Sequence, residues 1–191
     1  MISDEVLMLE FQGGSRAAFE ELFARYHQPL YGFFRRRLDR PDRAEDLAQE
    51  TFLAVIRGNS RYEPRALVRT YLYGIALKLL AAERRKQAHA DPITEVAAEH
   101  TIPRSTETVL WVQQALRTLE ASEREIIMLR EYEQLSYSEI SELLRIPVNT
   151  VRSRLFRARS ALKSHLESYR PEAPSRIRSA NRSQDEACHD K

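Results

Sequence analysis

One stretch near the C-terminal end, residues 136–162, constrains the fold more than any other part of the chain. Ser136 and Glu139 have the spacing of a capping box, which predicts the start of a short helix. A three-residue turn follows, and its last residue, Pro147, can start the next helix because the first helical turn does not use the missing N–H. The apolar residues of this next helix recur at intervals of three and four, at Val148, Val151, Leu155, Ala158 and Leu162. Two helices joined in this way predict a helix-turn-helix unit.

The second helix of this unit has the charge expected of a helix that faces phosphates. Residues 148–165 contain five basic side chains and no acidic one, whereas residues 117–145 contain four basic and seven acidic ones. Because the apolar stripe faces the bundle, the candidate DNA-reading residues point elsewhere: Asn149, Thr150, Arg152, Ser153, Arg154 and Arg157. The N-terminal end of such a helix enters the major groove, where Arg can bond guanine edges. The alternative is a solvated basic helix in an ordinary helical bundle.

Helical spacing continues through the rest of the chain, and no sustained strand pattern interrupts it. Helices are expected near residues 15–38 and at residues 42–57, 65–86 and 108–119, and a further helix is expected to begin at residue 122. Pro29 should kink the first of these helices. Asp42 with Glu45, and Ser122 with Glu125, have capping-box spacing. The apolar stripes of the first two helices include Phe19, Leu22, Phe23, Tyr26, Leu30, Phe33 and Phe34, then Leu47, Ala48, Phe52, Val55 and Ile56. The sequence therefore predicts an all-α fold.

Two small helical domains are expected, at residues 8–88 and 106–168. Residues 89–105 contain two prolines and an acidic excess, which predicts a flexible linker. Residues 169–191 contain one large aliphatic side chain, Ile177, so they cannot bury enough surface to fold and are expected to be a disordered tail.

Several classes of protein are excluded or disfavoured by composition and motifs. No run approaches the roughly 20 apolar residues that a membrane span needs, and the acidic N-terminus does not resemble a secretory signal. The single cysteine, Cys188, excludes an internal disulfide framework and favours a reducing cytoplasm. No nucleotide-binding, zinc-protease or nucleophile-elbow motif is present, and the five histidines have no ligand spacing. We therefore expect no enzyme activity, cofactor or metal, although Cys188 and His189 could bind a metal or sense oxidants.

The motifs together resemble a known family. The stretch LSYSEISELLRIPVNTVRSRLFRARSAL resembles region 4 of bacterial sigma factors of the extracytoplasmic-function (ECF) type. The segments AFEELFARYHQPLYGFFRRRL, DRAEDLAQETFLAVI and YLYGIALKLLAAERRK resemble region 2 of the same family, in the same order. The resemblance implies a dissociable subunit that brings RNA polymerase core to promoter DNA. It further implies that region 2 docks on the polymerase clamp and opens the minus-ten element, that region 4 reads the minus-thirty-five element, and that an anti-sigma factor masks these surfaces.

The resemblance also assigns residues of region 2. The DLAQETF segment corresponds to the polymerase contact, with Asp46, Gln49, Glu50 and Leu53 as candidate binding residues. Candidates for minus-ten DNA are basic and aromatic, since extruded bases stack on aromatic rings and a basic groove holds the backbone: Arg61, Tyr62, Arg65, Arg69, Tyr71 and Lys78. The alternatives are a solvated face for the first set and, for each tyrosine, core packing or a simple surface position.

Some positions depart from the family pattern. Tyr71-Leu72 stands where the family usually has Trp-Leu, Leu77-Lys78 replaces a common Arg-Asn pair, and Ala82 replaces a typical aspartate. Asn149 replaces a common glycine in the recognition helix. The minus-ten base preference therefore does not follow from the sequence. The main alternative function is a free-standing helix-turn-helix regulator that acts without polymerase, and a second is a module that sequesters another factor.

Overall fold

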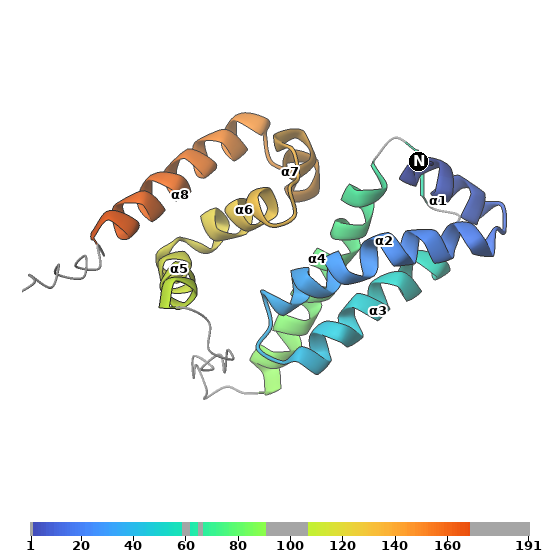
Figure 1. Cartoon of the computed structure of the whole chain (residues 1–191), viewed down its shortest axis with the longest axis horizontal. Coiled ribbons are helices and arrows are strands. Elements are labelled where there is room, and N and C mark those ends of the chain that lie inside the picture. Colours follow the sequence, from blue (N-terminus) through green and yellow to red (C-terminus); the bar gives the residue numbers. More distant parts are fainter. Residues whose placement is uncertain (1, 59–61, 65–66, 91–106, 169–191) are drawn as a thin grey trace, which may run out of the picture.

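The computed structural model describes residues 2–58, 62–64, 67–90 and 107–168. This part of the chain contains eight α-helices and no strand: α1 (Asp4–Gln12), α2 (Arg16–Arg35), α3 (Pro41–Arg57), α4 (Val68–Ala90), α5 (Glu107–Thr118), α6 (Ala121–Glu131), α7 (Tyr137–Leu144) and α8 (Val148–Ser168). Helices α1–α4 form an N-terminal bundle and α5–α8 a C-terminal bundle (Figure 1). The all-α, two-domain prediction is confirmed. Apart from residues 89 and 90, the expected linker and tail lie outside the described residues.

The N-terminal bundle begins earlier than expected, at α1. Ser3 caps this helix by accepting a hydrogen bond from the Val6 backbone N–H at 3.3 Å, and Leu7 and Met8 are buried in the core. The sequence does not predict α1 because apolar residues occupy both of its faces; Val6 and Leu9 are exposed. At the other end of the bundle, α4 continues to Ala90, through the residues where the linker was expected to begin.

Two of the three predicted capping boxes are wrong. Helix α3 begins at Pro41, with Arg40 as its N-cap and no side-chain cap, and the Glu45 carboxylate instead lies 2.9 Å from His27. Helix α6 begins at Ala121 after Glu120, one residue before Ser122, also without a side-chain cap. In both helices the predicted N3 glutamate has a distant partner, His27 on α2 for Glu45 and Arg37 in the turn after α2 for Glu125, which local spacing cannot reveal.

Most of the expected apolar stripes are buried, with two exceptions. Phe23 is 37% exposed and Ile56 is 46% exposed. The Phe23 ring stays packed nonetheless, with its centroid 4.7 Å from the rings of both His27 and Phe52. Helix α2 ends at Arg35, three residues before the expected end, and contains Pro29 inside a single helix.

The helix-turn-helix prediction agrees closely with the structure. Ser136 and Glu139 form a complete capping box at the start of α7. The turn depends on Arg145, whose left-handed backbone conformation (φ 54°) ends α7, and on Pro147, which lies just before α8 and accepts bonds from two backbone N–H groups of its first turn. Along α8, the fully buried side chains are Val151, Leu155 and Ala158. The opposite face of α8 is therefore left for solvent or a partner.

The two bundles are in contact through α4 and α7 (Figure 1). Gly74 on α4 lies at this contact, where a Cβ atom would be 3.6 Å from Leu143 on α7, an ordinary van der Waals distance. Apolar side chains of both bundles, including Tyr73 and Ile140, belong to one continuous buried cluster. A second cluster lies within the N-terminal bundle, between α1 and its neighbours.

Candidate nucleic-acid interface

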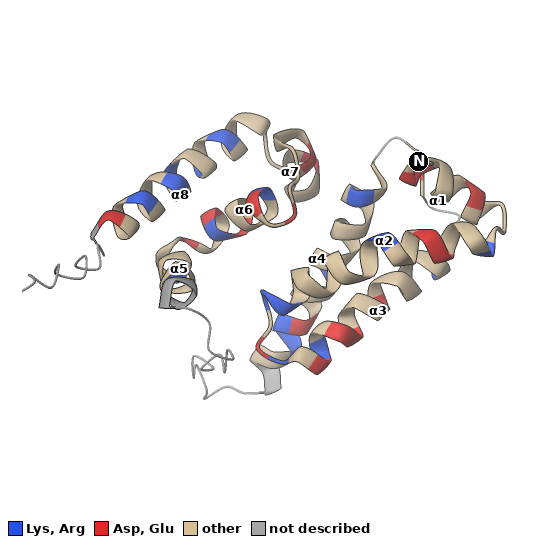
Figure 2. Cartoon of the chain, in the orientation of Figure 1, with Lys and Arg blue, Asp and Glu red and all other residues tan. Residues whose placement is uncertain are grey.

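The reading face of α8 is open and basic. Arg152 is exposed and Arg154 is half-buried, and neither guanidinium has an acidic partner among the residues that the structure describes. Asn149 is exposed beside them, while the Ser153 hydroxyl donates to the Thr150 carbonyl at 3.1 Å. Figure 2 shows the basic positions along α8, with an acid only near its C-terminal end. Unpaired guanidiniums on a helix whose other face is core are suited to bonding phosphates or base edges.

Arg157 differs from its neighbours, since it is already paired. Its Nε donates to Glu123 Oε1 on α6 at 2.8 Å, and the Glu123 side chain is largely buried while that of Arg157 is 59% exposed. This pair anchors the middle of α8 to the bundle. The Nε–H group of Arg157 is therefore already used in a hydrogen bond within the domain.

Phe156 is a candidate that the sequence reasoning missed. Its side chain is 74% exposed on the outward face of α8, four residues after Arg152. An exposed Phe beside arginines can contact a thymine methyl group in the major groove. Its position off the buried stripe of α8 was the available sequence signal.

The candidate partner surface on α3 is confirmed to be a continuous exposed strip, although its role stays a prediction. Asp46, Gln49 and Glu50 are exposed and Leu53 is 45% exposed. Arg43 holds Asp46 at 2.9 Å and also binds Glu83 of α4 at 2.8 Å, which fixes α3 against α4. The hydrogen bonds from Arg43 hold the pKa of Glu83 below its usual range, so the pair stays charged at neutral pH.

The candidate minus-ten residues are not all available. Arg61 and Arg65 lie outside the described residues. Tyr62 is 4% exposed, packed beneath α1 with its ring centroid 5.3 Å from that of Tyr71. Burial raises the pKa of the Tyr62 hydroxyl. The structure thus favours core packing for Tyr62, because α1, which the sequence did not predict, covers it. Tyr71 is half-buried and Lys78 is exposed.

Arg69 binds a residue of the other bundle. Its guanidinium donates to Glu139 of α7 through Nε at 3.0 Å and through Nη2 at 2.7 and 2.8 Å, and the Thr70 hydroxyl adds a bond of 3.3 Å. Burial alone would raise the pKa of Glu139, but the bonds from Arg69 and Ser136 outweigh it and lower the pKa. The same carboxylate therefore caps α7 and fixes α7 to α4.

A second ionic network connects the bundles around Glu133, which is almost fully buried. Arg36 Nη2 donates to both of its oxygens, at 2.9 and 3.0 Å, Arg37 Nη1 donates at 3.2 Å, and the Tyr73 hydroxyl donates at 3.1 Å. Burial, with the nearby Glu133 charge, raises the pKa of Tyr73, which keeps it a donor. Arg37 also binds Glu125 of α6 at 3.0 Å. Buried charges that pair across an interface hold it in one arrangement.

No group of three His, Cys, Asp or Glu side chains suited to a metal ion occurs among the described residues. In the same part of the chain, every helix is too short or too polar to cross a bilayer. Cys188 and His189 lie outside the described residues.

Comparison with known proteins identifies both bundles. The family model described as Sigma-70 region 2 matches residues 22–90, and the model described as Sigma-70, region 4 matches residues 110–162. The RNA polymerase sigma-H factor of Pseudomonas aeruginosa is 31% identical over 181 residues, which cover 86% of this chain and 94% of that protein. The ECF RNA polymerase sigma-E factor of Haemophilus influenzae is 30% identical, over 87% of this chain and 96% of that protein.

A solved structure supports the fold. The sigma factor RpoE of Bartonella quintana, solved in complex with the anti-sigma factor NepR, matches with a TM-score of 0.66 and 24% sequence identity. The match covers 80% of this chain and 98% of that one.

Proposed function

This chain belongs to the ECF group of the sigma-70 family of RNA polymerase sigma factors, and from that premise we propose how its residues divide the recognition of a promoter. As a sigma factor it directs RNA polymerase core to promoter DNA. Its relatives are named as transcription factors and not as catalysts, which agrees with the lack of a catalytic motif. A role with polymerase also fits residence in the cytoplasm.

The C-terminal bundle reads the minus-thirty-five element through α8. The observation that carries this assignment is the pair Arg152 and Arg154, which lie opposite the buried stripe and have no acidic partner in the described part of the chain. Asn149, Thr150, Ser153 and Arg157 surround them, and Phe156 extends the same face. Arg157 acts here chiefly as an anchor, because Glu123 holds it.

The test is promoter binding by holoenzyme containing single substitutions. Arg152→Ala or Arg154→Ala should each weaken binding by about 1–3 kcal/mol if it contacts a base, and should relax specificity at one position. Lys163→Ala is the matched control, since Lys163 is exposed near the far end of the same helix and pairs with Glu167 at 3.7 Å. Full promoter binding by both arginine variants would refute the assignment.

The exposed strip of α3 binds the polymerase clamp. Asp46, Gln49 and Glu50 offer polar and acidic groups, and the exposed Leu53 adds apolar area at the end of the strip. Pull-down with core enzyme tests this: the triple alanine variant of the three polar residues should lose most binding. A control variant, Glu20→Ala with Glu21→Ala, removes two exposed acids from α2 instead. Equal retention of the two variants on core enzyme would count against the α3 surface.

The N-terminal bundle engages minus-ten DNA through Arg69, Tyr71 and Lys78, together with Arg61 and Arg65. Arg69 can take part only after it leaves Glu139, so strand opening requires the two bundles to separate at α4 and α7. Permanganate footprinting on a promoter tests the set. Normal opening by a variant with Arg69→Ala and Tyr71→Ala would remove these two residues from the proposal.

An anti-sigma factor is the expected regulator. The RpoE structure was solved with such a partner, and in this chain an occupant of the exposed α3 strip would compete with polymerase. The alternative function, a free-standing regulator, is not favoured, because both family models and the named relatives are sigma factors. Transcription from a genomic promoter library with core polymerase separates the two, since a regulator would bind its operator without polymerase and would not redirect initiation.

A further inference from the structure

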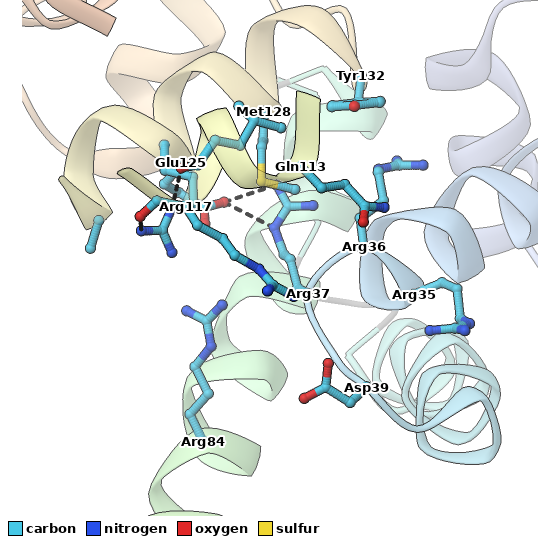
Figure 3. A pocket seen from close by; sticks show the side chains of 13 residues that line it. Arg35, Arg36, Arg37, Asp39, Arg84, Gln113, Arg117, Glu125, Met128 and Tyr132 are labelled. Carbon is cyan, nitrogen blue, oxygen red and sulfur yellow. Dashed lines mark hydrogen bonds and ion pairs between the residues drawn. The ribbon is translucent and has the colours of Figure 1, made fainter. Parts of the chain in front are cut away.

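A cavity of about 460 Å³ lies where the two bundles meet (Figure 3). Its wall comes from the end of α2 and the turn after it, from α4, and from α5 and α6 of the other bundle. A volume of this size is within the range of small-molecule sites, which is about 300–1,000 Å³. Neither bundle encloses the cavity alone.

The wall of this cavity is strongly basic. Its charged side chains are six arginines and two carboxylates, Arg35, Arg36, Arg37, Arg84, Arg117 and Arg124 against Asp39 and Glu125. Six positive charges minus two negative ones leave a net charge of +4 on the wall. When Glu133, which binds Arg36 and Arg37 from behind the wall, is added to the count, the net formal charge is still +3.

The arginines of the wall differ in how many hydrogen bonds and ion pairs they already make within the protein. Arg37 is held by Glu125 and Glu133, and Arg124 donates to three backbone carbonyls at the end of α5. Arg84 has no hydrogen bond or ion pair among the described residues, and its side chain extends from α4 toward α5 (Figure 3). Because Arg84 is exposed and has no acidic partner there, its guanidinium is available to an anion that enters the basic cavity.

We propose that this cavity binds a small ligand that carries a di- or triphosphate group. Guanidinium groups are planar forks that bind phosphate oxygens in pairs, and several of them converge here from two directions. Leu116 and Met128 supply an apolar part of the wall, against which a nucleoside could pack. The phosphates would thus lie beside Arg84, between α4 and α5.

Such a ligand would hold the two bundles together. It would contact α4 of one bundle and α5 of the other, and a ligand that binds only the joined arrangement stabilises that arrangement in proportion to its concentration. The effect on transcription rests on the proposed function, because separation frees Arg69 for DNA. The binding itself does not, and it can be measured without polymerase.

The experiment is calorimetric titration of the full chain with inorganic tripolyphosphate and, separately, with GTP, at low salt and without divalent cations. Arg84→Gln and Arg117→Gln, one from each bundle, should each weaken binding of both probes by roughly tenfold. Lys86→Gln is the matched control: it removes one exposed charge from α4, two residues beyond Arg84 and outside the cavity wall, and should leave affinity unchanged. Tighter binding of GTP would assign a nucleotide, and equal binding would assign inorganic polyphosphate.

Two results would overturn the proposal. One is the absence of binding by either probe. The other is an equal loss of affinity in Arg84→Gln and Lys86→Gln, which would show attraction to the general basic surface. Arg69→Gln provides a further arm, since Arg69 lies outside the cavity wall and its loss weakens the contact between the bundles. Affinity should fall in this variant, and unchanged affinity would refute a site built from both bundles.

Discussion

Removal of the Glu133 carboxylate should separate the two bundles. In the structure this side chain is 2% exposed and accepts hydrogen bonds from Arg36, Arg37 and Tyr73, all of which belong to the other bundle. Glu133→Ala leaves the buried Tyr73 hydroxyl without this acceptor and removes half of the acidic partners of Arg37. Among the described residues, the Glu133 carboxylate has no hydrogen bond or ion pair within its own bundle, so the C-terminal bundle should still fold.

The magnitude follows from the burial of the pair. Loss of one partner of a buried ion pair costs about 3–5 kcal/mol, and the lower end applies because Arg37 keeps Glu125. Once the bundles have separated, water solvates all of these groups and the substitution changes little. The ratio of joined to separated molecules should therefore fall by more than about a hundredfold, since 1.4 kcal/mol is a factor of ten. Glu133→Gln, which keeps one acceptor oxygen, should cost about 1 kcal/mol.

Energy transfer between two dyes measures this ratio. With Cys188→Ser to remove the native thiol, dyes are attached through Ala24→Cys on α2 and Ser160→Cys on α8, both exposed positions. Urea is added until the bundles separate, and the midpoint should fall in the order native, Glu133→Gln, Glu133→Ala. Glu142→Ala, which removes an exposed acid from α7, is the control. A midpoint for Glu133→Ala equal to that of the control would refute the reasoning.

Three further outcomes follow from the same contacts. The pKa of Glu139 is lowered in the joined arrangement, so its contribution to the stability of that arrangement is complete above the ordinary pKa of 4.5. This contribution is lost as the pH falls through the lowered pKa, and the urea midpoint of bundle separation should decrease there. Arg69→Gln should remove most of this pH dependence. Ser136→Ala should destabilise the C-terminal bundle by about 1 kcal/mol in urea unfolding followed by circular dichroism, through the loss of the α7 cap, and an unchanged midpoint would contradict the capping role. Gly74→Ala should stabilise the N-terminal bundle by about 0.5–1 kcal/mol, because the 3.6 Å to Leu143 accommodates a methyl group; a fall in thermal stability would show that the α4–α7 approach is tighter.

The sequence predicted what depends on neighbouring residues. The capping box of Ser136 and Glu139 and the buried stripe through Val151 and Leu155 are set by spacings of three and four, and both are present. What it could not predict depends on distant partners. Glu125 has capping spacing but pairs with Arg37, 88 residues away, in place of a local N–H group.

The candidate DNA residues illustrate the same limit. Arg152 and Arg154 are assigned by the face of one helix, and that face is open as expected. Tyr62 is buried because α1 packs over it, and Arg69 is engaged because α7 of the other bundle meets α4. The sequence predicted which side chains could bind DNA from their type and their position in a local pattern. Whether each of them is accessible to DNA depends on tertiary contacts between segments about 50–70 residues apart, such as Gln12 with Tyr62 and Arg69 with Glu139.

The two proposed DNA-binding surfaces of this sigma factor are therefore in different states within one structure. On the outward face of α8, Arg152 and Arg154 have no acidic partner among the described residues, so this face would need no rearrangement to meet a duplex. Arg69 in the other bundle must first exchange Glu139 for a phosphate, and this exchange also breaks the α4–α7 contact. If polymerase binds at α3, as proposed, that binding leaves the α4–α7 contact intact, and the joined chain would dock before it opens DNA. Separation of the bundles is then the step at which the minus-ten surface becomes competent, and any ligand or substitution that shifts this equilibrium should change strand opening more than duplex binding.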